Sequence, residues 1–267
     1  MFKAILYYLL MIFEFIITMF GAGLVLGIYI SHAGIENKAM QLEKSVPLLL
    51  CFWLLGMLVI WFTFYKAKFA KFSFGLVAPN KKWKAMLYTT LPIFGFTLFY
   101  YSLTQLLGIS INISELKYFS YVYTIPFMVV GSFISAYIFY GAILEELIKC
   151  GKSKWVSFLT LFLMVFFLSF FAVLNERFGG IVFLIDVFVT TVYAFFIYYL
   201  TRSSIILFVI YVTANLIPFN LGPTPLCVAL GIVGLAMAIY GAMLLNKGKS
   251  EILIKEDEGE PFGQYLN

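Results

Sequence analysis

Two adjacent glutamates, Glu145 and Glu146, are the residues of this chain best suited to acid–base chemistry. A glutamate carboxylate in a site with little water can act as the general base that activates a water molecule for hydrolysis. Lys149 follows Glu145 by four positions, which on a helix is the favoured order for an ion pair. We therefore expect Lys149 to pair with Glu145 and to leave Glu146 facing the interior of a helix bundle. The alternative is a helix end at which lysines neutralise both acids.

Other polar residues interrupt apolar runs elsewhere in the chain. Asn175 ends one run, and Tyr211 and Asn215 stand four positions apart in another, so they share one face of a helix. Glu14 and Asp186 are ionisable residues within apolar runs, where a charge is costly and a functional role is the default hypothesis. For Glu14 the sequence favours a packing role, whereas water could reach Asp186 near the end of its run.

Apolar helices must position all of these residues. The chain has 267 residues, of which 63% are hydrophobic and 12% are charged, whereas a soluble domain carries about 25% charged residues. Lipid is the solvent that suits so much apolar surface, so we predict an all-α bundle of about eight transmembrane helices. A spanning helix needs about 20 mostly apolar residues. Eight stretches qualify or nearly do: 4–30, 46–65, 86–107, 122–146, 155–175, 181–200, 204–218 and 226–245.

The basic residues predict the orientation, because lysine and arginine collect on the cytoplasmic side of a membrane. With the N-terminus inside, 14 of the 18 basic residues fall in cytoplasmic segments. The other 4 fall in outside loops: Lys38, Lys44, Lys117 and Arg177. This split predicts N-in and C-in, with a transmembrane domain over 1–245 and a flexible cytoplasmic tail over 246–267. Lysine outnumbers arginine 16 to 2, a bias typical of AT-rich bacterial genomes, so we expect a bacterial cytoplasmic membrane.

Several kinds of site are not indicated. The segment 66–85 alternates lysines with Phe and Trp, which suits a cytoplasmic loop or a stretch that lies on anionic lipid headgroups. No other basic surface accompanies it, so nucleic-acid binding is not expected. The three cysteines form no CxxC pair, and His32 is the one histidine, so neither a metal site nor a cofactor is expected.

Glycines predict where two helices approach closely. Gly21, Gly23 and Gly27 have the spacing typical of close helix packing, and Gly231 and Gly234 have it less clearly.

Three short motifs, in this order, resemble those of the CAAX protease and bacteriocin-processing family of intramembrane proteins, also called the Abi family. The family's motifs read EExxxR, FxxxH, and HxxxN or HxxxD on successive helices. Here the first reads EELIKCG over 145–151, the second FAVLN over 171–175, and the third YVTAN over 211–215. The stretches YLTRSS over 199–204 and FGL over 74–76 resemble family segments too, so the resemblance covers about residues 70–220.

The resemblance implies that a glutamate of the first motif activates water, and that two histidines and an asparagine complete the site. Glu145, Glu146 and Asn215 match this pattern, but Asn175 and Tyr211 stand at the two histidine positions, and a cysteine replaces the arginine. Asparagine exchanges no proton near neutral pH, and tyrosine is a poor substitute for imidazole. Each lost acid–base group typically removes a factor of about 10²–10⁴ in rate, so little proteolysis of the family's kind is expected.

Three functions remain open. The leading expectation is a non-catalytic family member, a scaffold that binds a peptide or a membrane protein. The second is an active peptidase with an altered site, in which a glutamate is the base and Asn175, Tyr211 and Asn215 hold the oxyanion. The third is a transporter, channel or bacteriocin-immunity protein, in which Asp186 and Glu14 line a path or bind an ion. In all three the chain is embedded in membrane lipid.

Overall fold

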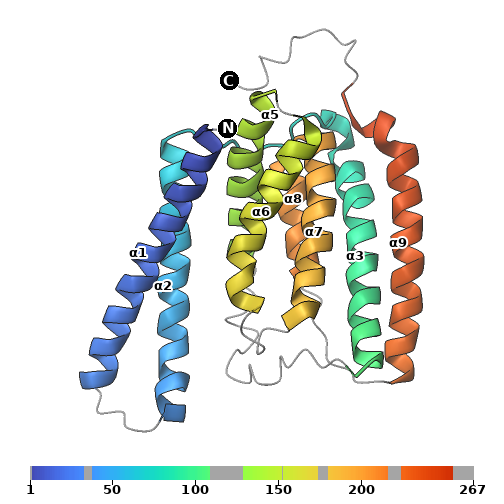
Figure 1. Cartoon of the computed structure of the whole chain (residues 1–267). Coiled ribbons are helices and arrows are strands. Elements are labelled where there is room, and N and C mark those ends of the chain that lie inside the picture. Colours follow the sequence, from blue (N-terminus) through green and yellow to red (C-terminus); the bar gives the residue numbers. More distant parts are fainter. Residues whose placement is uncertain are drawn as a thin grey trace. The chain divides into compact units, whose positions relative to one another are not determined.

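The computed structural model describes residues 2–32, 38–108, 129–151, 153–173, 180–215 and 224–254 (Figure 1). Within these ranges the regular structure is helical, apart from one isolated bridge between Val77 and Leu253. The predicted all-α class is therefore confirmed. The chain divides into two compact units: the first comprises 1–71 and 112–164, and the second comprises 72–111 and 165–267.

The helices follow the apolar stretches of the sequence, and each of the eight predicted stretches overlaps a helix. In chain order they are α1 (Phe2–His32), α2 (Lys38–Lys66), the short 3-10 helix η1 (Pro79–Lys81), α3 (Lys82–Leu106), the π-helical η3 (Ser135–Leu144), α5 (Glu145–Lys149), α6 (Lys154–Val173), α7 (Gly180–Thr201), α8 (Ser204–Asn215) and α9 (Pro225–Ile252). The elements η3 and α5 belong to one continuous helix, Val129–Lys149.

Four helices of the described ranges are long and apolar enough to cross a membrane: Phe2–His32, Val129–Lys149, Leu184–Thr201 and Pro225–Ile252. Large apolar side chains stand exposed along two of them, such as Phe20 at 70% and Ile232 at 66%. Such surfaces are a liability in water but suit lipid. The helices therefore indicate a membrane protein.

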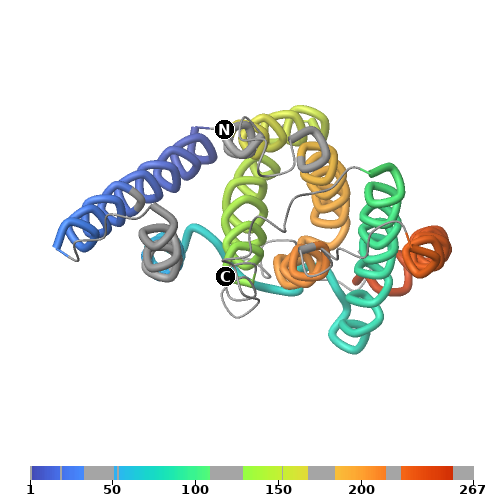
Figure 2. Tube along the Cα trace, turned by 90° about the horizontal axis from the view of Figure 1, so that it is seen from below, coloured from blue at the N-terminus to red at the C-terminus, as the bar shows by residue number. Residues whose placement is uncertain are grey.

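The first unit is built on the packing of α1 along α2, which lie side by side in both views (Figures 1 and 2). Thr18 of α1 contacts Gly56 of α2, where the absent side chain lets the two backbones approach. At the other end of the pair, the ring of Tyr7 stacks on Phe69, with 4.4 Å between the ring centroids, and Phe64 packs edge-on against both. These ring contacts fix how the start of α1 packs on the end of α2 and the turn after it.

The second unit contains the tightest helix packing, between α3 and α9, which are neighbours in both views (Figures 1 and 2). A Cβ atom on Gly234 of α9 would lie 2.6 Å from the Phe99 nitrogen and 2.8 Å from the Gly95 oxygen of α3. A Cβ atom on Gly241 would lie 2.7 Å from the nitrogen of Pro92. These glycines are required because any larger residue would push the two backbones apart.

The glycines of α1 do not form, with the described residues, the close helix contact that their spacing predicts. A Cβ atom on Gly21, Gly23 or Gly27 would meet nothing within 4 Å in the described part of the chain. The contact face of α1 runs instead through Thr18 and Ala22, which is 1% exposed. Small residues permit a close approach, but the neighbouring helix decides which face is used.

The segment before α3 is anchored to two helix ends within the second unit. The Ser73 amide donates to Oγ of Ser204 at 2.9 Å, and the Leu76 amide donates to the Thr201 carbonyl at 2.8 Å. Gly75, with φ of 59°, fits against the backbone of Thr201 and leaves no room for a side chain. This turn therefore depends on glycine for both its conformation and its packing.

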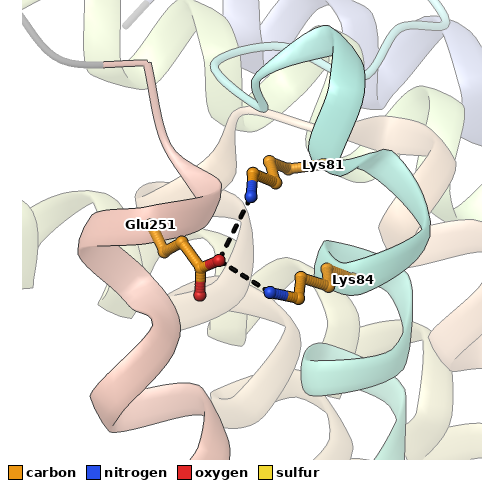
Figure 3. Close-up of polar contacts among 3 residues, drawn as sticks. All are labelled: Lys81, Lys84 and Glu251. Atoms are coloured by element: carbon orange, nitrogen blue, oxygen red, sulfur yellow. Dashed lines mark hydrogen bonds and ion pairs between the residues drawn. The ribbon is translucent and has the colours of Figure 1, made fainter.

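The end of α9 is fastened to the same segment. The Ala78 amide donates to the Ile252 carbonyl at 3.0 Å. Lys81 and Lys84 both reach Oε1 of Glu251, at 3.2 and 2.6 Å (Figure 3). Residues 246–252, which we expected in a flexible tail, are therefore the last turns of α9, because these contacts hold them in place. The rest of the expected tail, from 255, lies outside the described residues.

Candidate functional site

Glu145 and Glu146 lie at the junction of the π-helical η3 and the α-helical α5 in the first unit. A π-helical segment is rare and frequently marks a functional position. The hydroxyl of Tyr137 in η3 donates to the Ala70 carbonyl at 3.0 Å. A Cβ atom on Gly141 would lie 3.6 Å from the Lys71 carbonyl. The helix that presents the two glutamates is thus packed against the turn that follows α2.

Lys149 forms its ion pair with Glu146 at 3.5 Å, three positions away. The expectation that Lys149 pairs with Glu145 is therefore wrong. Side chains three and four positions apart on a helix are similarly close, so spacing alone does not choose between the two glutamates. The Glu146 side chain is only 18% exposed, and Glu145 is half-buried.

The first motif ends its own helix. The Cys150 amide donates to the Glu146 carbonyl at 3.1 Å, and the Gly151 amide donates to the Ile148 carbonyl at 3.0 Å. Gly151 has φ of 65°, the left-handed conformation that commonly follows the last residue of a helix. The glycine of the motif therefore has a structural role, which fixes where the helix carrying both glutamates stops.

Tyr7 of α1 is a neighbour of this pair that the motifs do not reveal. It lies close enough to Glu146 for the two groups to interact electrostatically. Tyr7 is buried, and its position is set by the aromatic contacts with Phe64 and Phe69. A motif search would miss it, because it is far from the glutamates in sequence.

The other candidate residues belong to the second unit or lie outside the described residues. Tyr211 and Asn215 are on α8, which packs against α3 and α7. Tyr211 is half-buried. The neighbouring Thr213 hydroxyl donates to the Val209 carbonyl of its own helix at 2.7 Å, so it is occupied locally. Asn175 is not among the described residues. The structure thus places Glu145 and Glu146 on one helix, and Tyr211 and Asn215 on another.

The chemistry open to these residues is limited to carboxylate, amide and phenol groups. Within the described ranges, no three His, Cys, Asp or Glu side chains are grouped so as to hold a metal ion. Cys51 and Cys150 are exposed, Cys227 is buried, and none of the three is in a disulfide. His32 is exposed in the last turn of α1. The two glutamates therefore offer carboxylate acid–base chemistry.

Comparisons with protein-family models, with curated proteins and with solved structures find no match for this chain. The resemblance to the CAAX protease and bacteriocin-processing family thus rests on the three short motifs.

Two further carboxylates lie on helices long and apolar enough to cross a membrane, one in each unit. Glu14 of α1 and Asp186 of α7 each have a buried oxygen without a hydrogen-bond partner in the described part of the chain. A third such atom, the Thr190 hydroxyl, lies four positions after Asp186. Thr190 was missed from the sequence, although its spacing from Asp186 would have pointed to it.

Proposed function

We propose that this chain is a multi-pass membrane protein of the CAAX protease and bacteriocin-processing type that has lost catalysis and binds a peptide or a membrane protein. The observation that carries this proposal is the ion pair between Lys149 and Glu146. It engages a motif glutamate in a helix-end contact, while both histidine positions of the motifs hold asparagine and tyrosine.

The proposed topology has eight spans, with both termini in the cytoplasm of a bacterium. Eight apolar stretches support it, since each overlaps a helix. The distribution of lysine and arginine supports the N-in and C-in orientation. In this topology Lys149 and the two glutamates lie at the cytoplasmic end of their helix, where a partner or a peptide segment entering from the cytoplasm can reach them.

The retained polar residues supply the means of binding. Glu145 and Glu146 offer carboxylate oxygens, and Asn215 and Tyr211 offer an amide and a phenol, all of which form hydrogen bonds to a peptide backbone. Within a membrane such bonds have few aqueous competitors. A chain with these groups, and without imidazole at the motif positions, can hold a peptide but has little capacity to transfer the protons that hydrolysis requires.

The proposal is tested by affinity purification of the intact protein from its host in mild detergent, with mass spectrometry of what co-purifies. The wild type is compared with a Glu145→Gln, Glu146→Gln double variant. Glu251→Gln is the matched control, because it removes a carboxylate outside the motifs. We expect one stoichiometric membrane partner or peptide on the wild type and the control, with no change in the partner's length between samples.

A catalytic function makes the opposite prediction. An uncleaved precursor that accumulates only on the double variant would show that the glutamates still perform chemistry. A gain of peptide cleavage after Asn175→His and Tyr211→His substitution would not by itself contradict the proposal, since it would restore the lost groups. Cleavage by the unmodified chain would contradict it.

A further inference from the structure

Three polar side chains of α7 lie on one face of the helix: Asp186, Thr190 and Tyr193, at spacings of four and three positions. The Tyr193 hydroxyl donates to the Thr89 carbonyl, so this face of α7 looks toward α3. Both helices belong to the second unit. The polar groups are therefore enclosed between two helices of one compact body.

The Asp186 end of this face meets phenol groups of α3. Asp186 lies close enough to Tyr100 and Tyr101 to interact electrostatically with both. Tyr100 is buried, at 9% exposure, and Asp186 is half-buried. Asp186 thus lies within electrostatic range of two phenols of α3, and Thr190 lies on the same face of α7 as Asp186.

Two oxygens in this region are buried and unsatisfied. Asp186 Oδ1 and Thr190 Oγ1 have no hydrogen-bond partner among the residues that the structure describes. Thr190 is 6% exposed. A buried polar atom without a partner is costly, and a carboxylate is more costly than a hydroxyl. An unmet carboxylate and an unmet hydroxyl, side by side on one helix face, are the donor set for a cation.

We propose that Asp186 and Thr190 bind one sodium ion between α3 and α7, with the phenol oxygens of Tyr100 and Tyr101 beside it. Carboxylate and hydroxyl oxygens are hard ligands, which suit a hard cation. One carboxylate balances one positive charge, and a divalent ion would leave an excess charge in a medium of low dielectric constant. No group of three ligating side chains for a transition metal accompanies it within the described ranges.

A proton explains the two oxygens less well than an ion does. Asp186 and Thr190 form no hydrogen bond with each other, so a proton on the carboxyl would leave the hydroxyl oxygen unsatisfied. An ion placed between them engages both oxygens. The sodium site goes beyond the proposed binding of a peptide or membrane partner and does not depend on it.

The first unit contains a natural control for this site. Glu14 is also followed by a threonine four positions later, but the Thr18 hydroxyl donates to the Glu14 carbonyl at 2.8 Å. That hydroxyl is therefore occupied within its own helix, whereas the Thr190 hydroxyl is not. Glu14→Gln and Thr18→Val match Asp186→Asn and Thr190→Val in chemistry without touching the proposed site.

The test uses the full-length protein in mild detergent and measures its unfolding temperature as sodium chloride replaces choline chloride at constant ionic strength and neutral pH. A ligand that binds the folded state stabilises it by mass action. We expect the wild-type unfolding temperature to rise with sodium and to reach a plateau. Asp186→Asn should abolish the rise. Thr190→Val should need about tenfold more sodium for the same rise, because the variant loses one hydrogen bond or ligand contact to a charged group. Glu14→Gln and Thr18→Val should respond as the wild type does.

The proposal is overturned if the wild type shows no response to sodium, or if Asp186→Asn retains the full response. An unfolding temperature that depends on pH but not on sodium also overturns it and assigns the site to a proton. If Asp186→Asn does not fold, Thr190→Val decides: an unshifted sodium curve for this variant rejects the site.

Discussion

The Nζ atom of Lys84 lies 2.6 Å from Oε1 of Glu251, so the first turn of α3 and the last turn of α9 are joined across 167 positions of the chain (Figure 3). Lys81 reaches the same oxygen at 3.2 Å. Glu251 lies beyond Leu245, where the apolar run of α9 ends, so these contacts are made outside the apolar part of the helix.

Glu251→Gln should lower the unfolding temperature of the detergent-solubilised protein slightly, by roughly 1–2 °C, because exposed ion pairs contribute little. The difference from the wild type should shrink at high salt, since salt screens exposed charges. Lys247→Gln changes a charge on the same helix and is the matched control. An equal decrease of the unfolding temperature in both variants would show that the ion pair itself contributes nothing to stability.

The same pair predicts a dependence on pH. The hydrogen bond from Lys84, followed by that from Lys81, lowers the pKa of the Glu251 carboxyl below its ordinary value of 4.5. A carboxyl whose folded-state pKa is lowered stabilises the fold above its unfolded-state pKa, and this contribution disappears as the pH falls through the lowered value. The wild type and Glu251→Gln should therefore differ at neutral pH and converge in acid. Unfolding temperatures that differ equally at every pH would contradict this assignment.

Gly234→Ala should destabilise the second unit by about 1–3 kcal/mol, because the new methyl group would press on backbone atoms of α3 that cannot rotate away. The control is Gly21→Ala, whose methyl group would meet no described atom within 4 Å. Unfolding in a graded series of detergent or denaturant concentrations measures the stability of both variants. Equal stability of the two variants would mean that α3 and α9 pack less closely than the distances at Gly234 indicate.

The eight-span topology predicts which positions a membrane-impermeant maleimide reaches in intact cells. In a chain whose three cysteines are replaced by serine, Lys38→Cys and Arg177→Cys should be labelled from outside. Lys82→Cys and Lys247→Cys should be labelled only after permeabilisation, because this topology assigns their segments to the cytoplasm. Labelling of Lys247→Cys in intact cells would exclude a C-in orientation, and failure of Arg177→Cys to label would exclude the predicted outside loop.

The sequence by itself determined the kind of protein and the approximate position of its helices. Each of the eight apolar runs overlaps a helix of the described residues, because a helix satisfies its own backbone groups and needs no partner segment to do so in lipid. The run over 4–30 became α1, and the run over 226–245 became the apolar part of α9. Length and hydropathy are local properties, so a single sequence is enough to read them.

Tertiary structure alone decided which residues on those helices meet. The spacing of Lys149 allowed a pair with either glutamate, and the fold selected Glu146. Glycine spacing favoured α1, but the close packing lies at Gly234 of α9. The shared burial of Asp186 and Thr190 against α3 was likewise invisible in the sequence. The helical period defines which residues share a face of a helix. Which neighbour covers that face is decided by packing between segments far apart in the chain. That packing brings the chemical groups together.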